Sequence, residues 1–136
     1  MSYTLHLGDS DTQIPEWKIL ERQKAMANRG RYDGLIKASN AGVKIAFGTD
    51  AGSPVVGHEI VAPELKFMIE LGIKKDNYDA LRCATIVAAE VSKIDDHLGT
   101  LEVGKSADVI VMSGNPPENL DALEGIEMTF IAGKDM

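Results

Sequence analysis

Residues 43–52 (Val-Lys-Ile-Ala-Phe-Gly-Thr-Asp-Ala-Gly) constrain the fold more than any other stretch of this 136-residue chain. Apolar residues run as far as Phe47, Gly48 ends the run, and a single carboxylate, Asp50, follows between small neighbours. This pattern predicts a buried strand over residues 43–48 that ends in an acid. Strand ends are common positions for reactive side chains in α/β proteins, because the sheet holds them rigidly while solvent and ligands reach them. Asp50 is therefore the first candidate site residue.

Composition narrows the class of protein. The chain has 21 acidic and 14 basic residues, a net charge of −7, which disfavours nucleic acid and anionic membranes as partners. No apolar run approaches the roughly 18 to 20 residues that span a bilayer, and the N-terminus lacks a signal-peptide pattern, so we expect a cytoplasmic protein. Cys83 is the only cysteine, which excludes an intrachain disulfide and a cage of thiolate metal ligands.

Helical spacing of apolar residues predicts three helices. A long or broken helix is expected over about residues 15–40, ended by the turn at Gly42. A second is expected over 63–71. A third is expected over 77–93, with Asp76 placed as its N-terminal cap.

Strand patterns occupy both ends of the chain. Residues 3–7 are strand-like, a short extended piece lies between the glycines at 99 and 104, and stronger strands are expected at 107–112 and 127–132. The predicted order is strand, helix, strand, two helices and three short strands. This order is typical of the end of a larger α/β protein.

Four features in this order resemble the C-terminal part of the metal-dependent amidohydrolase superfamily, in particular its imidazolonepropionase-like and prolidase-like branch. They are the stretch 41–52, His58 followed by Glu64-Leu65, the helix with Ala80-Leu81 and Ala84-Thr85, and Leu-Gly-Thr-Leu-Glu-Val-Gly-Lys-Ser-Ala-Asp-Val-Ile-Val at 98–111. The Gly-Thr-Asp and Leu-Gly-Thr-Leu-Glu-x-Gly-Lys-x-Ala-Asp signals are each fairly specific. The resemblance runs from about residue 15 to the end.

The resemblance implies an α/β fold in which a (β/α)8 barrel is followed by a small β-sandwich. Residues 1–94 would form the C-terminal end of the barrel, with 43–49 as its eighth strand and residues 3–5 as the end of strand seven. Residues 95–136 would return as strands to the sandwich. A complete barrel takes about 200 to 250 residues. We therefore expect this chain to be a C-terminal fragment or a truncated gene product.

The same resemblance implies a chemistry. Superfamily members hold one or two divalent metals, for which zinc is the expected identity here, with a His-x-His pair, other histidines, often a carboxylated lysine, and an aspartate after strand eight. Asp50 matches that aspartate, which makes it both a metal ligand and the catalytic acid–base. It would take a proton from a water molecule that the metal activates and deliver it to the leaving amine of an amide, a dipeptide such as Xaa-Pro, or a cyclic amide.

The histidines do not complete such a site. His6, His58 and His97 form no His-x-His pair, whereas a catalytic zinc ordinarily takes about three protein ligands. The isolated chain is therefore expected to be inactive. His58 is a candidate substrate-binding residue, with a surface or loop-packing histidine as the alternative, and His6 and His97 are expected to be structural or solvated.

Simpler interpretations stand beside these hypotheses. Asp50 could cap a turn through its own backbone, and Cys83 is better explained as a small buried hydrophobe than as a nucleophile. The leading hypothesis is a hydrolase of C–N bonds that acts on a small amide or dipeptide. The alternative is a non-catalytic scaffold that self-associates through exposed barrel-facing apolar surface and the unpaired edge of the eighth strand. A homo-oligomer is expected.

Overall fold

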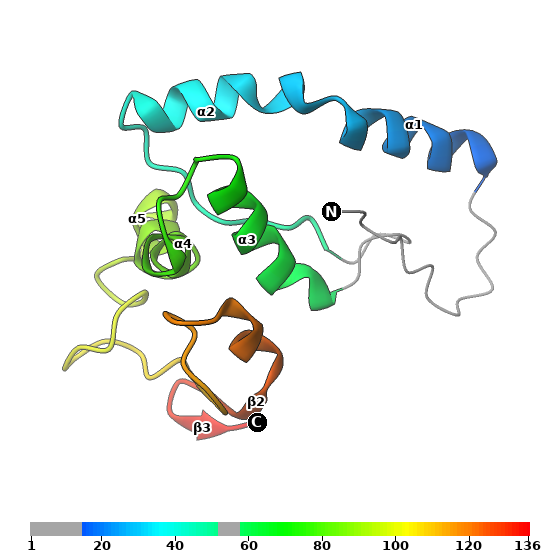
Figure 1. The fold of residues 1–136 in the computed structure, drawn as a ribbon. Helices are drawn as coiled ribbons and strands as arrows, with labels where there is room; N and C mark the ends of the chain where they lie inside the picture. Colours follow the sequence, from blue (N-terminus) through cyan, green and yellow to red (C-terminus); the bar gives the residue numbers. More distant parts are fainter. Residues whose placement is uncertain (1–14, 52–57) are drawn as a thin grey trace.

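The structure, a computed structural model, describes residues 15–51 and 58–136. Within these ranges it contains five α-helices, three short 3-10 helices and one three-stranded sheet. Figure 1 shows α1 and α2 as one extended helical arm, α3 beside it, and the sheet at the opposite end of the molecule. The strand expected at residues 3–7 and the histidine His6 lie outside the described residues. No helix in the described ranges is both long and apolar enough to cross a membrane.

The helical arm confirms the broken helix that was predicted over residues 15–40. It consists of α1 (Glu16–Ala27), the 3-10 helix η1 (Arg29–Tyr32) and α2 (Asp33–Asn40). The middle of the arm contacts the C-terminal half of α3. The rings of Tyr32 and Phe67 meet edge to face at 5.2 Å.

Glycines end two of the helices, which confirms the turn predicted at Gly42. Gly42 follows α2 with a φ of 79°, and Val43 N–H donates to the carbonyl of Ala38 (3.0 Å). Gly72 repeats this arrangement after α3 with a φ of 72°, and Ile73 N–H donates to the carbonyl of Met68 (3.0 Å). Both are Schellman motifs, in which a left-handed residue lets the following N–H groups satisfy the last helical carbonyls.

The expected helix at 63–71 is α3 (Val61–Glu70). The single helix predicted over 77–93 is wrong, because the chain divides there into α4 (Asn77–Cys83) and α5 (Ile86–Ser92). The interruption lies at Thr85, whose hydroxyl donates to the carbonyl of Leu81 (3.0 Å). Threonine side chains that bond the backbone in this way compete with helix propagation.

The N-terminal cap predicted for α4 is confirmed. The carboxylate of Asp76 accepts a hydrogen bond from the N–H of Asp79 (2.8 Å), which satisfies one of the orphan donors of the first turn. The carboxylate of Asp79 accepts from Lys75 N–H (3.2 Å), one residue before the cap. The start of α4 is thus held from both sides.

A single apolar cluster joins the helices to the C-terminal part of the chain. Its buried members are Leu65, Met68, Ile73, Ala80, Cys83 and Leu120. The first five come from α3, α4 and the turn between them. Leu120 comes from the 3-10 helix η3 (Leu120–Glu124), far along the chain.

The sheet is antiparallel, with the order β1 (Val109–Met112), β2 (Ile126–Ile131) and β3 (Lys134–Asp135). It confirms the strands predicted at 107–112 and 127–132. Residues 132 and 133 turn the chain from β2 to β3 with φ values of 51° and 75°, the left-handed pair that a two-residue hairpin requires. The extended piece expected between residues 99 and 104 is not a strand. The chain there bends at residues 99–100, is irregular at 101–102 and turns at 103–104.

The strand predicted over residues 43–48 is also absent. These residues are irregular and join no sheet in the described part of the chain, where the one sheet is antiparallel and lies elsewhere. A strand exists only when neighbouring chains satisfy its backbone groups. Here the N–H of Phe47 donates instead to the carbonyl of Cys83 (2.9 Å). The described residues therefore form helices and a small sheet, without the parallel barrel or sandwich that the resemblance implies.

Candidate active-site segment

Asp50 lies near the end of an irregular segment, residues 43–51, that follows α2. Asp50 is exposed, and its φ of 53° lies in the left-handed region. Aspartate tolerates this region better than most side chains, although any L-residue other than glycine adopts it uncommonly. The segment therefore presents one carboxylate to solvent on an unusual backbone turn.

Three kinds of contact fix this segment to the helices. Ile45 and Phe47 pack against the apolar cluster. The ammonium group of Lys44 pairs with the carboxylate of Glu90 on α5 at 2.8 Å. The Phe47 N–H group donates to the carbonyl of Cys83 at the end of α4 (2.9 Å). The base of the turn that carries Asp50 is thus held by packing, charge and a backbone hydrogen bond.

The break between α4 and α5 explains why the Cys83 carbonyl can accept that bond. A helix leaves its last four carbonyls without intrahelical partners. At the end of α4, the Thr85 side chain donates to Leu81, and Thr85 N–H donates to Arg82 (3.2 Å). Because no continuing helix uses the carbonyl of Cys83, it is open to the N–H of Phe47. The interruption that the sequence did not reveal therefore anchors the candidate site.

The turn itself is closed by a neighbour of Asp50. The N–H of Ala51 donates to Oγ1 of Thr49 at 3.1 Å. This is a hydroxyl-to-backbone turn. The sequence showed a threonine directly before the acid, but its spacing alone carried no sign of this bond.

The described residues do not by themselves fit a catalytic metal centre. Among residues 15–51 and 58–136, no group of three or more His, Cys, Asp or Glu side chains is close enough to hold a metal ion. A catalytic zinc ordinarily takes about three protein ligands. Asp50 can therefore supply at most one ligand of such a centre together with groups from elsewhere.

Among the described residues, no histidines and carboxylates gather around Asp50 as a ligand set. His58 begins the 3-10 helix η2 (His58–Ile60), and only its backbone is described. His97 is exposed on the loop after α5, where its carbonyl accepts from Ser106 N–H (2.9 Å). His97 is thus a solvated loop residue, one of the two roles expected for it.

Cys83 is a core residue. Its side chain is fully buried, and the thiol donates to the carbonyl of Ala80 (2.9 Å). Burial raises the pKa of the Cys83 thiol above its ordinary value, and the nearby charge of Lys74 acts in the opposite direction. A thiol held neutral in this way is a poor nucleophile, so the interpretation of Cys83 as a small buried hydrophobe is confirmed.

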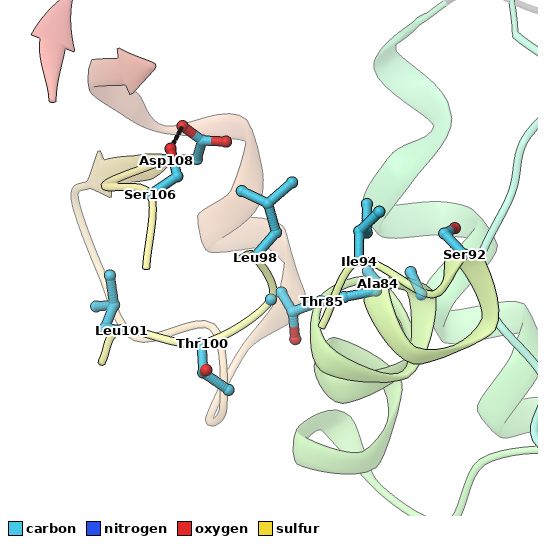
Figure 2. A pocket seen from close by; sticks show the side chains of 12 residues that line it. Ala84, Thr85, Ser92, Ile94, Leu98, Thr100, Leu101, Ser106 and Asp108 are labelled. Carbon is cyan, nitrogen blue, oxygen red and sulfur yellow. Dashed lines mark hydrogen bonds between the residues drawn. The ribbon is translucent and has the colours of Figure 1, made fainter. Parts of the chain in front are cut away.

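A hollow of about 440 Å³ lies between α5 and the loop that follows it, and Asp50 is not among its lining residues. Figure 2 shows Ile94 and Leu98 in it, with the carboxylate of Asp108 at its edge. Asp108 accepts from the hydroxyl of Ser106 (2.9 Å) and from the N–H of Ala132 (2.7 Å). The carboxylate therefore joins the start of β1 to the β2–β3 turn. This hollow shares no residue with the segment that carries Asp50.

Comparison with known proteins identifies the class. The sequence profile of the Amidohydrolase family matches residues 4–136, and the chain therefore belongs to this family. The resemblance that the Gly-Thr-Asp and C-terminal motifs indicated is confirmed.

The relatives that match this chain include a deaminase and a dipeptidase. A 5-methylthioadenosine/S-adenosylhomocysteine deaminase of Thermoanaerobacter pseudethanolicus is 27% identical in an alignment 132 residues long, which covers 85% of this chain and 29% of the deaminase. The solved structure of a Xaa-Pro dipeptidase with bound methionine in its active site is 35% identical, with a TM-score of 0.72, and the match covers 93% of this chain and 30% of the dipeptidase.

A prolidase-like protein from Bifidobacterium longum is 32% identical, with a TM-score of 0.77, and the match covers 96% of this chain and 31% of that protein. This chain thus spans less than one third of the length of the relatives that it matches.

Proposed function

We propose that this chain is part of a hydrolase of C–N bonds, in which Asp50 is the catalytic acid–base. The observation that carries the proposal is the placement of Asp50: an exposed carboxylate on a turn whose base is anchored to α4 and α5. Membership of the Amidohydrolase family supports the same chemistry. Dipeptidases cleave a peptide C–N bond and deaminases a C–N bond to an amino group, so the two kinds of relative share this reaction type.

In the proposed reaction, Asp50 accepts a proton from the attacking water and donates it to the departing amine. A positioned carboxylate that handles protons in this way contributes about 10²- to 10⁴-fold to a rate. A divalent metal, with zinc as the proposed identity, would supply the acidity that water otherwise lacks. Asp50 would be one of its ligands, and the others would come from outside the described residues.

We propose a dipeptide or another small amide as the substrate. Two structural relatives above 30% identity are a Xaa-Pro dipeptidase and a prolidase-like protein, whereas the deaminase is 27% identical. His58 remains the candidate for substrate contact, and its backbone at the start of η2 is followed directly by α3. Cleavage of Xaa-Pro dipeptides is therefore the first activity to measure.

A chimeric protein tests the proposal. In it, this chain replaces the matching third of the Bifidobacterium longum prolidase-like protein, and Xaa-Pro dipeptide hydrolysis is followed with added zinc. We expect turnover, and we expect Asp50→Asn to lower kcat by about 10² to 10⁴, because an amide cannot accept and return the proton as a carboxylate does. This chain alone is expected to show no turnover.

The matched control is Asp135→Asn, which makes the same chemical change on the exposed strand β3. It should leave kcat unchanged. A folded chimera that hydrolyses none of the dipeptides or acyl-amino-acid amides, or one in which Asp50→Asn keeps full activity, would contradict the proposed function.

A further inference from the structure

The backbone at Asp50 is the starting point. Its φ of 53° places a residue with a side chain in the left-handed region, where the Cβ atom crowds the following carbonyl. Such a conformation persists only where the surrounding structure holds it, and it is found disproportionately at functional sites. Two neighbouring contacts could do this at Asp50.

The first contact bridges Asp50. Thr49 Oγ1 accepts the N–H of Ala51 at 3.1 Å, so the two residues that flank Asp50 are joined to each other across it. Threonine is stiff about χ1 because its Cβ is branched. Thr49 is also half-buried, whereas Asp50 is exposed. The hydroxyl is therefore an acceptor of restricted conformation directly beside an exposed aspartate.

The second contact fixes the base of the same turn. Phe47, two residues before Thr49, donates its N–H to the carbonyl of Cys83 (2.9 Å) and packs against the apolar cluster. The position of Thr49 is therefore tied to the end of α4. The local hydrogen bond at Ala51 then transmits that fixed position to the carboxylate.

We propose that Thr49 is a positioning residue: its hydroxyl, by accepting the N–H of Ala51, holds Asp50 in the left-handed turn that directs the carboxylate toward the reacting groups. This inference rests on the proposed function in so far as Asp50 is the acid–base. Reactive groups must be held close to their productive geometry, and displacement by about 1 Å can cost about 10²-fold in rate.

Amide hydrogen exchange on the full chain tests the contact directly. Thr49→Val keeps the branched shape and removes the acceptor, whereas Thr49→Ser keeps the acceptor. Thr49→Val should raise the exchange rate of Ala51 N–H about threefold to tenfold, in line with the loss of one hydrogen bond, and should change the Asp50 HN–Hα coupling constant. Thr49→Ser should leave both the exchange rate and the coupling constant as they are in the unsubstituted chain. Thr129→Val, the same change on β2, should alter neither.

The functional consequence is measured in the chimera. Thr49→Val should lower kcat while KM stays unchanged, and Thr49→Ser should recover kcat, because the change displaces Asp50 without removing it. Unchanged Ala51 exchange in Thr49→Val overturns the proposal. So does a chimera in which exchange rises but kcat does not fall. If the chimera is inactive altogether, the proposed function fails, while the exchange experiment still decides whether Thr49 holds the turn.

Discussion

The side chain of Cys83 packs in the core, and its backbone carbonyl anchors the candidate site. The thiol is fully buried and donates to the carbonyl of Ala80, while its own carbonyl accepts the N–H of Phe47. A substitution that disturbed the helix end here would move the segment that carries Asp50. Because burial is the main cause of the raised pKa of the Cys83 thiol, its ionisation reports on how well the core excludes water.

We predict that Cys83 makes the folded state less stable as the pH becomes alkaline. Burial raises the pKa of its thiol above the ordinary 9.0. A group with a raised pKa in the folded state stabilises it fully below the unfolded pKa, and this contribution is lost as the pH rises through the folded pKa. The free energy of unfolding should therefore fall more steeply above about pH 9 than it does in Cys83→Ala.

Urea unfolding of both proteins between pH 7 and pH 10.5 makes the measurement. Lysine and tyrosine titrations are common to the two proteins and cancel in the difference between their free energies of unfolding. A difference that stays constant over the whole range would show that the Cys83 thiol ionises as readily in the folded state as in the unfolded one.

At the scale of elements, the sequence predicted the ends that local chemistry determines. Asp76 caps α4 and Gly42 ends α2 as expected, because each acts within a few residues of itself. The sequence did not predict the break at Thr85 or the irregular course of residues 43–48. These two features meet in the hydrogen bond between Phe47 and Cys83, which joins distant positions.

The sequence likewise predicted one part of the candidate site and not the other. Asp50 was predicted because its flanks carry a motif that can be read in the sequence. Its left-handed backbone and the bond between Thr49 and Ala51 were not predicted, since both depend on how the turn is anchored. Position in a motif made Asp50 the candidate acid–base, and only the fold showed what holds it.

The packing of α5 against the loop after it yields a prediction at Gly99. A Cβ atom there would lie 2.7 Å from the Cβ of Ala89 and 3.0 Å from the Cα of Ile86, in a residue whose φ is +94°. Gly99→Ala should therefore destabilise the protein both by backbone strain and by overpacking, which typically costs about 1 to 3 kcal/mol.

Gly104→Ala separates the two causes. Gly104 has a nearly identical φ of +96°, yet a Cβ there would meet nothing within 4 Å. Thermal or urea unfolding should show a larger loss of stability for Gly99→Ala, by about 1 to 3 kcal/mol of overpacking. Equal losses for the two variants would mean that the loop does not press on α5 in solution.

At the scale of the whole molecule, the C-terminal part is tied to the helices by contacts of three kinds. The ammonium of Lys66 on α3 pairs with the carboxylate of Asp121. The side-chain amide of Asn77 at the start of α4 donates to the carbonyls of Pro117 and Glu118 (both 3.2 Å). The polar contacts lie at the exposed rim, where such interactions are worth little. Apolar packing makes the third kind of contact: Leu120 is buried in the apolar cluster, and Leu123 packs against it.

We therefore predict that Leu120→Ala destabilises helices and sheet together. Leu120 is 1% exposed and packs in the same cluster as Leu65, so its truncation leaves a cavity that should cost about 2 to 5 kcal/mol. Leu101→Ala, the same change at a residue 78% exposed, should cost less than about 0.5 kcal/mol. Urea unfolding is followed by far-ultraviolet circular dichroism for the helices and by the amide signal of Phe130 for β2. In Leu120→Ala both midpoints should fall by the same amount. A sheet signal that melts separately, with the helices unaffected, would show that the C-terminal part folds without the core to which Leu120 belongs.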